Sequence, residues 1–236
     1  MARILHLETA TQICSVALSE DEKIVAFRES VEKNAQSSIL TVFVDEIFRE
    51  TGINAHKLDA ISVSMGPGSY TGLRIGVSAA KGLCYAADKP LIAVNTLEAM
   101  AGGMIEKSSE SLGNSADYLF CPMIDARRME VYSAIFNFKM EKIREVKAEI
   151  IDEQSFRELL SHQKILFAGD GAEKCKLLLK IYENAKFMNG FSPSANYLVE
   201  IANQKFKENK FENVAYFEPF YLKDFIAGPP KVKGLI

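Results

Sequence analysis

The chain has 236 residues, of which 48% are hydrophobic and 25% are charged, and its net charge at pH 7 is −3. A chain of this length and apolar content can bury a substantial core, in one large domain or two small ones. The slightly acidic balance excludes a global basic field that would attract nucleic acid, so a role on RNA would need a partner or a local basic patch.

The cysteines and the first residues indicate a reducing compartment. Four cysteines lie far apart, without a CxxC pair: Cys14, Cys84, Cys121 and Cys175. This spacing predicts free, buried thiols. His6 and Glu8 interrupt the apolar core that a signal peptide would need, and no run of about 18 apolar residues occurs. We therefore expect a cytoplasmic protein without a membrane segment.

The first 95 residues follow the order strand, strand, strand, helix, strand, helix, strand. Short apolar runs predict the strands over residues 3–9, 13–19, 23–30, 59–65 and 89–95. Apolar residues at helical spacing predict the first helix over 36–50, with Gly52 where a C-terminal cap would fall. An Ala- and Gly-rich stretch predicts the second helix over 72–87.

The second half repeats this order of elements. Strands are predicted over 117–125, 129–138, 143–151, 164–169 and 185–187, and helical segments over 153–161 and 172–182. The Gly/Ser-rich stretch 100–116 is the natural boundary, so lobes of residues 1–100 and 101–236 are expected, with the C-terminal segment a candidate to pack back on the first. The order is that of the actin-like/Hsp70-like (ASKHA) α/β fold, with duplicated ribonuclease-H-like lobes, and does not give function.

The loop "GPGSYTG" at residues 66–72 lies between a strand and a helix, where free N–H groups can bind an anion. It lacks the GK[ST] of a Walker loop and the spacing of a dinucleotide fingerprint. The candidate anion or nucleotide contacts are Gly66, Gly68, Ser69, Thr71 and Arg74, together with Arg127 and Arg128 of a later turn. The role of Gly169-Asp170-Gly171 stays open.

The alternative is that the glycines serve packing. Gly66 and Gly68 would turn the chain, Ser69 or Thr71 would cap the helix, and a small-residue face would let another helix approach. That face would serve either internal packing or a subunit interface shared with the first helix. The candidate interface residues are Ile39, Leu40, Phe43, Val44, Ile47, Gly72, Ile75, Gly76, Ala79, Ala80 and Leu83.

Several motifs in order along the chain resemble those of the TsaB (YeaZ) family, the inactive paralogues of the TsaD/Kae1 proteins. They are "ILHLETA" near the start, "GPGSYTGLRIG" at 66–76, "MIDARRMEVY" at 123–132, "GDGA" at 169–172, "SPSANYL" at 192–198 and "EPFYLKDF" at 218–225. The resemblance implies the actin-like fold and a scaffold for TsaD that, with the ATPase TsaE, supports threonylcarbamoyladenosine formation beside the anticodon of tRNA. It also implies a TsaD heterodimer, tRNA contact through the complex, and a homodimer when the protein is alone.

Independent catalysis is not favoured by the residues. TsaD-like proteins hold a metal through two histidines four apart, and the matching positions here are Thr96 and Met100, which cannot replace imidazoles. His6 reads as a satisfied core histidine, and His56 and His162 as surface residues. No GxSxG elbow occurs. The alternative function is an M22-like glycoprotease (metallopeptidase) or a small-molecule kinase on the same fold.

An intrinsic cofactor is not expected. Actin-like ATPases use glycine-rich hairpins, whereas the turns here are "ETATQ" and "DARRM", so ATP or ADP would bind only at an interface shared within the complex. Arg127 and Arg128 either meet an anion or pair with carboxylates such as Glu130. Lys223 stands where the family pattern has arginine, which puts a bidentate anion contact there in doubt.

Overall fold

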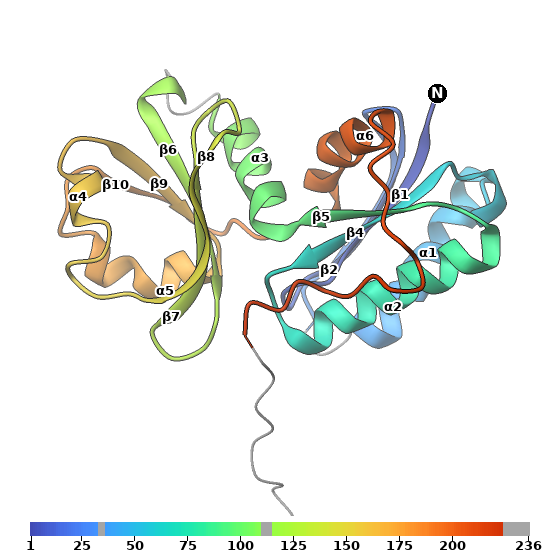
Figure 1. Ribbon diagram of the computed structural model, residues 1–236, viewed down its shortest axis with the longest axis horizontal. Coiled ribbons are helices and arrows are strands. Elements are labelled where there is room, and N and C mark those ends of the chain that lie inside the picture. Colours follow the sequence, from blue (N-terminus) through green and yellow to red (C-terminus); the bar gives the residue numbers. More distant parts are fainter. Residues whose placement is uncertain (33–35, 110–114, 224–236) are drawn as a thin grey trace, which may run out of the picture.

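The computed structural model describes residues 1–32, 36–109 and 115–223. The chain forms two α/β lobes side by side, joined by α3 and by the later crossing of the chain back to the first lobe (Figure 1). Among the residues described, no helix combines the length and the apolar character needed to cross a bilayer.

The first lobe is a five-stranded mixed sheet in the order β3-β2-β1-β4-β5. Its elements are β1 (Arg3–Glu8), β2 (Cys14–Glu20), β3 (Lys23–Ser30), α1 (Gln36–Thr51), η1 (Ala55–Lys57), β4 (Ala60–Gly66), α2 (Tyr70–Ala87) and β5 (Leu91–Asn95). The strands β1, β2 and β3 pair antiparallel, and β4 and β5 add parallel to β1. The helices α1 and α2 cover one face of this sheet.

The second lobe has its own five-stranded sheet, in the order β10-β9-β6-β7-β8, and its topology repeats that of the first sheet. Its elements are η2 (Ser115–Asp117), β6 (Tyr118–Asp125), β7 (Glu130–Phe136), β8 (Lys142–Ile150), α4 (Arg157–Leu160), β9 (Lys164–Ala168), α5 (Asp170–Leu179) and β10 (Ala185–Met188). As in the first lobe, three antiparallel strands come first and two parallel strands complete the sheet. The predicted actin-like fold with duplicated lobes is confirmed by this repeated topology.

Helix α3 (Thr96–Ser108) corrects the expectation of a Gly/Ser-rich boundary over 100–116. Asn95 caps it by accepting hydrogen bonds from the N–H groups of Leu97 and Glu98, at 3.0 and 3.2 Å. A Cβ atom at Gly103 would come within 2.5 Å of the Tyr197 ring, so glycine here permits close packing instead of breaking the helix. Residues 110–114 of the expected boundary lie outside the described part.

After the second lobe the chain returns to the first. The short helix η3 (Ala195–Leu198) and α6 (Val199–Lys207) cover the face of the first sheet opposite α1 and α2. The apolar cluster there joins Ala195, Leu198 and Ala202 to residues of β1, β2, β4 and β5. The last described residues then run along α2 (Figure 1). The first lobe therefore depends on residues from the end of the chain.

Candidate functional site

The glycine loop after β4 turns the chain into α2. Gly66 has φ 114°, a conformation that favours glycine. Ser69 is the N-cap of α2, and its hydroxyl accepts a hydrogen bond from the N–H of Gly72 at 3.3 Å. The N–H of Ser69 donates to the carbonyl of Ala10 at 2.6 Å. Thr71 lies exposed on the first turn. The backbone N–H of Ser69 is thus engaged within the chain, whereas its hydroxyl, which accepts a hydrogen bond here, keeps its O–H donor.

Three glycines let α2 approach the end of β1. A Cβ atom at Gly68 would lie 2.4 Å from the carbonyl oxygen of Ala10. At Gly72 it would lie 2.1 Å from the carbonyl oxygen of Thr9, and at Gly76 2.3 Å from the Thr9 hydroxyl. The Thr9 hydroxyl donates to the carbonyl of Gly72 at 2.8 Å. Because no side chain fits at these distances, these glycines serve internal packing.

The buried carboxyl group of Glu8 lies beside this contact and was not singled out from the sequence. One oxygen accepts a hydrogen bond from the N–H of Ala10 at 2.6 Å, and the other is shielded from solvent without a partner among the described residues. Burial raises the pKa of Glu8 to about 7, against the effect of the Ala10 N–H. A carboxyl group at this turn disfavours a phosphate there. The signal in the sequence is an acidic residue that ends an apolar strand.

The candidate anion contacts fall into two separate places. Arg74 is exposed on α2, with its guanidinium 5.4 Å from the centre of the Tyr70 ring. Arg127 and Arg128 are exposed in the turn between β6 and β7, with φ 72° and 52°. Arg74 donates a hydrogen bond to the Tyr70 hydroxyl of the glycine loop at 3.3 Å, whereas Arg127 donates its N–H to the Asp125 carboxylate at 2.7 Å in its own turn. The seven candidates thus lie on the glycine loop and α2 in one lobe and on the β6–β7 turn in the other, and their role as anion contacts stays a prediction.

Glu130, at the start of β7, pairs with Lys223 instead of Arg127 or Arg128, which corrects the alternative considered from the sequence. Lys223 comes from the last described residues, so this ion pair links the C-terminal segment to the second lobe. Nearby, Phe220 donates its N–H to the carbonyl of Met65 at 2.7 Å in the first lobe. The segment thus contacts both lobes where they face each other (Figure 1).

The segment Gly169-Asp170-Gly171 packs against the end of β6, as the glycine loop packs against β1. A Cβ atom at Gly169, whose φ is 104°, would lie 2.2 Å from the carbonyl oxygen of Met123. Asp170 accepts hydrogen bonds from the N–H groups of Asp125 and Gly171, both at 2.9 Å. Burial raises the pKa of Asp170 above its usual value. Each lobe therefore uses glycines to bring a helix against its first strand.

Six of the eleven candidate interface residues lie inside the first lobe, which corrects their assignment to a partner surface. The buried ones are Leu40, Val44, Ile47, Gly72, Gly76 and Ala80. They cover the chain's own sheet, because the apolar faces of α1 and α2 are the outer layer of its core. The half-buried ones are Ile39, Phe43, Ile75, Ala79 and Leu83, at the border of the same core.

The outer face of α2 carries residues that the sequence reasoning missed. Tyr85 is 87% exposed, and Gly82 is exposed with open space around it. Lys81 donates to the carbonyls of Ala215 and Phe217, at 3.2 and 3.0 Å, and holds the C-terminal segment along the helix. A shallow hollow of about 570 Å³ lies between helix and segment, lined by Lys81, Gly82, Tyr85, Asn213, Val214 and Ala215. We call this surface the α2 face.

The two positions that match the metal-binding histidines of TsaD-like proteins are part of the core. The hydroxyls of Thr96 and Ser64 share a hydrogen bond at 2.7 Å, and both side chains are buried. Met100 is 1% exposed. Within residues 1–32, 36–109 and 115–223, no three His, Cys, Asp or Glu side chains are grouped as metal ligands. Hydroxyl and thioether groups in this packed setting do not fit a catalytic iron or zinc ion.

His6 is a satisfied core histidine, as predicted. Its Nδ1 shares a hydrogen bond with the Ser62 hydroxyl at 2.7 Å, and its Nε2 one with the Ser19 hydroxyl at 2.9 Å. Burial lowers the pKa of His6 to about 3, so the ring is neutral at physiological pH. His56 and His162 are exposed, as expected. All four cysteines are free and buried, which confirms that prediction too.

The repeated sheets and the packed strand-to-helix turns define a two-lobed actin-like α/β protein. The family model described as TsaD, tRNA N6-adenosine threonylcarbamoyltransferase, matches residues 29–230. The tRNA threonylcarbamoyladenosine biosynthesis protein TsaB of Escherichia coli strain K12 is 32% identical over 95% of this chain and 96% of its own. The chain belongs to the TsaB branch of the TsaD family.

Two further proteins extend the similarity. The TsaB protein of Haemophilus influenzae is 29% identical over 94% of this chain and 93% of its own length. A Pseudomonas aeruginosa protein described as similar to peptidase YEAZ has a solved structure that superposes with a TM-score of 0.80, at 23% identity, over 94% of this chain and all of its own. The structural similarity supports the fold.

Proposed function

We propose that this protein takes part in the biosynthesis of threonylcarbamoyladenosine in tRNA, as a scaffold subunit that has no catalytic activity by itself. One observation carries the proposal. At the two positions where TsaD-like proteins have metal-binding histidines, this chain has Thr96 and Met100, and both side chains are buried in the core. The similarity to proteins named for this biosynthesis, over nearly the whole chain, supports the pathway.

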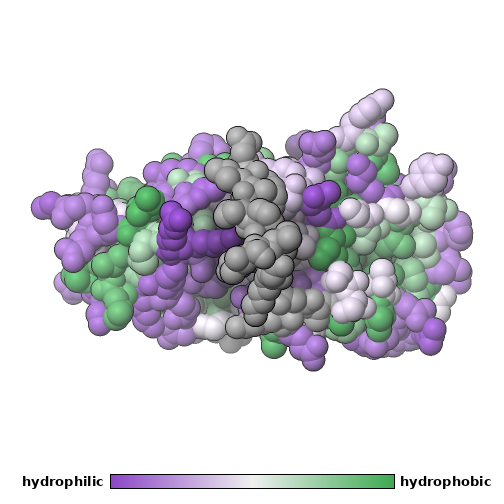
Figure 2. All heavy atoms as spheres, turned by 90° about the horizontal axis from the view of Figure 1, so that it is seen from below, coloured by the Kyte–Doolittle hydropathy of each residue, from purple (hydrophilic) through white to green (hydrophobic). Residues whose placement is uncertain are grey.

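The partner surface of the proposed scaffold is the α2 face. It presents Tyr85 and Gly82 outward beside a hollow that a partner side chain can fill. Seen from below, hydrophobic side chains lie among polar ones on both lobes (Figure 2). Aromatic residues such as Tyr85 are enriched at surfaces that bind a partner. The partner is a TsaD-type transferase, with which this chain forms a heterodimer, and without it the same face supports a homodimer.

A nucleotide, if the complex holds one, binds at an interface with another subunit. Within this chain the turn after β1 is filled by the glycine contacts and the Glu8 carboxyl group. Contact with TsaE and with tRNA belongs to the complex, and Arg127 and Arg128 are exposed on the second lobe for such contacts. With a net charge of −3, the protein alone binds tRNA weakly and in a steeply salt-dependent manner.

The test is a reconstitution of threonylcarbamoyl transfer to tRNA with TsaD- and TsaE-type proteins from the same source, with and without this chain. The proposal expects transfer only when this chain is present, and no transfer by this chain alone. Full transfer without it would contradict the scaffold role. Hydrolysis of a glycoprotein, or phosphorylation of a sugar, by the purified chain would favour the alternative peptidase or kinase function.

A further inference from the structure

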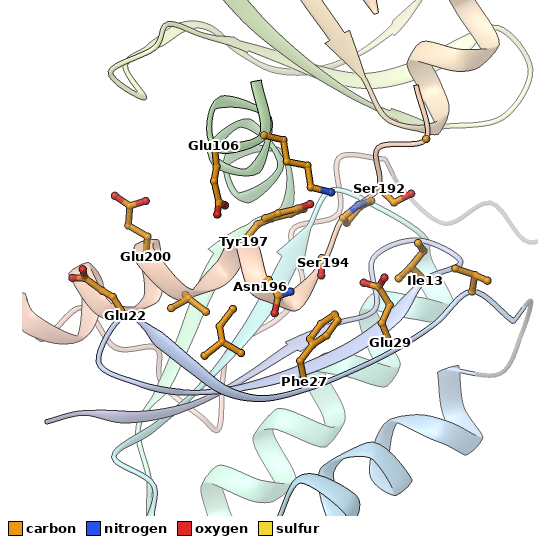
Figure 3. Close-up of a pocket in the computed structure, with 16 residues that line it drawn as sticks. Ile13, Glu22, Phe27, Glu29, Glu106, Ser192, Ser194, Asn196, Tyr197 and Glu200 are labelled. Carbon is orange, nitrogen blue, oxygen red and sulfur yellow. The ribbon is translucent and has the colours of Figure 1, made fainter. Parts of the chain in front are cut away.

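A groove of about 610 Å³ runs along β3 on the side of the sheet away from α1 (Figure 3). Strand β3 is at the edge of its sheet, and within the described ranges no other strand pairs with its outer side. One wall of the groove comes from β3 and its flanks, and the other from the end of α3 and from residues 190–200. The proposed scaffold function does not use the residues that line this groove.

The floor of the groove is apolar and open to solvent. Phe27 and Tyr197 lie within it, and Ile24 and Val31 on β3 and just after it are 37% and 70% exposed. The second wall is firmly placed, because the N–H of Ala195 donates to the Ser15 hydroxyl at 2.8 Å. The groove is therefore a fixed depression in which apolar side chains lie among polar and charged ones, and it is available to a ligand.

The rim of the groove is acidic. Its carboxylates are Glu22 and Glu200 towards one end, Glu29 towards the other, and Glu106 on the upper wall (Figure 3). Glu22 pairs with Lys207 at 3.0 Å, whereas the other three carboxylates have no ion pair or hydrogen bond within the described ranges. The one basic residue among those that line the groove, Lys107, lies over the rings of Phe191 and Tyr197, 5.5 Å from each centre. The groove thus offers three free negative charges.

Asn196 adds a hydrogen-bond acceptor inside the groove. Its side chain lies between Tyr197 and Phe27 (Figure 3). Its Oδ1 atom is shielded from solvent and has no partner among the described residues. Because Oδ1 is shielded, a ligand N–H group reaches it only when the Asn196 side chain rotates towards the groove, and the new hydrogen bond then removes the cost of an unpaired buried acceptor.

We propose that this groove binds an extended segment of a partner protein in which lysine or arginine residues alternate with apolar residues. The basic side chains pair with Glu29, Glu106 and Glu200, and the apolar ones cover Phe27 and Ile24. A backbone N–H of the segment donates to Asn196 Oδ1. The segment lies along β3, over the face of the sheet that lines the groove.

The length of the groove favours a peptide over a smaller ligand. The lining residues on β3 run from Glu22 to Val31, a span of about 30 Å at the rise of an extended chain. That span matches about nine residues of a bound strand, and the carboxylates lie at both ends of it. The same negative charges disfavour RNA and acidic membranes on this side of the molecule.

The test measures binding of a fluorescein-labelled peptide, acetyl-KIKVKIKVK-amide, to the full chain by fluorescence anisotropy at low salt. The matched probe is acetyl-EIEVEIEVE-amide. We expect saturable binding of the basic peptide alone, with the Asn196 side-chain amide resonance shifted in NMR spectra. The double variant Glu29→Lys, Glu106→Lys is expected to weaken binding by about tenfold or more, because it exchanges attraction for repulsion.

The control variant combines Glu183→Lys with Glu153→Lys, which makes the same charge change at two exposed positions outside the groove. Both groove positions are exposed, and Glu106 lies in the last turn of α3, where a lysine suits the helix dipole, so the double variant should fold. The proposal is overturned by an absence of peptide binding, by equal binding of both peptides, or by equal weakening in the control variant. If spermidine, added at the same concentration of positive charge as the peptide, displaces it, the groove binds polyamines and the proposal of a protein segment is wrong.

Discussion

Gly72 of α2 lies so close to Thr9 at the end of β1 that a Cβ atom would be 2.1 Å from the Thr9 carbonyl oxygen. This contact shows that glycines of the loop allow α2 to pack closely against β1. It joins the helix that carries the candidate partner surface to the central strand of the first sheet. Changes in the loop should therefore act first on the stability of the lobe and only then on partner binding.

A comparison of two glycines in the same helix tests this. Gly72→Ala should lower the free energy of unfolding by about 1–3 kcal/mol, because backbone must move to accept the methyl group. Gly82→Ala, where nothing lies within 4 Å of the new Cβ atom, should raise it by up to about 1 kcal/mol through helix propensity. Urea unfolding followed by circular dichroism gives both values. Equal effects would contradict the packing role of Gly72.

The partner surface can be tested without damage to the fold. Gly82→Arg places a long, charged side chain on the α2 face, where the space is open, and should reduce binding of a TsaD-type transferase by about 100-fold or more. Gly82→Ala is the matched control and should bind normally. Calorimetric titration measures both affinities. If the Arg variant binds as tightly as the parent chain, the α2 face is not the interface.

The pH dependence of stability should reveal the buried Glu8. Its pKa is raised to about 7 in the folded state, so folding favours the protonated form. This stabilisation is complete below the unfolded pKa of about 4.5 and is lost as pH rises through 7. Glu8→Gln, which cannot ionise, should gain about 3 kcal/mol relative to the parent chain between pH 4.5 and 8.

Urea unfolding of both proteins across this range measures the difference. His6 titrates in the opposite sense, since its lowered pKa removes stability as pH falls below 6.5, but it is present in both proteins and cancels. A constant difference between parent and variant at all pH values would mean that Glu8 ionises in the folded protein as it does in the unfolded chain.

The C-terminal segment should loosen when its tie to α2 is removed. Lys81→Met keeps the length of the side chain but loses the donors to the carbonyls of Ala215 and Phe217. Amide hydrogen exchange at Phe220, whose N–H bonds to Met65, should then become faster by about tenfold, while exchange in β1 and β4 stays slow. Lys180→Met, at an exposed position of the second lobe, should leave Phe220 unchanged.

Local sequence patterns predicted the sheets, the duplication and the state of His6 well, because each strand or helix carries its own periodicity. They failed where packing partners are distant in the sequence. The Gly/Ser-rich stretch 100–116 predicts a boundary between lobes and not a helix, since nothing nearby in the sequence indicates that the Tyr197 ring packs against Gly103. Helix α6 was missed for the same reason.

The candidate partner surface shows the same limit. Apolar periodicity in α1 and α2 does not distinguish a face that covers the chain's own sheet from one that awaits another protein. Leu40 and Ile47 belong to the first kind, and Tyr85, an exposed aromatic residue outside the apolar stripe, is our proposed example of the second. Lys81 and the segment that it holds could not be paired from the sequence, because about 135 residues separate them.

The return of the chain to its first lobe has a consequence for synthesis on the ribosome. Ala195, Leu198 and Ala202 cover Ile92 and Val94 of the first sheet, and Glu212 donates its N–H to Leu91 at the sheet edge, at 2.8 Å. When only the first lobe of a nascent chain has left the ribosome, the face of its sheet that α6 covers therefore stays exposed until about a hundred more residues emerge. Folding of the lobe is completed last, although its strands are made first, and chaperones that bind exposed sheets have that interval in which to act.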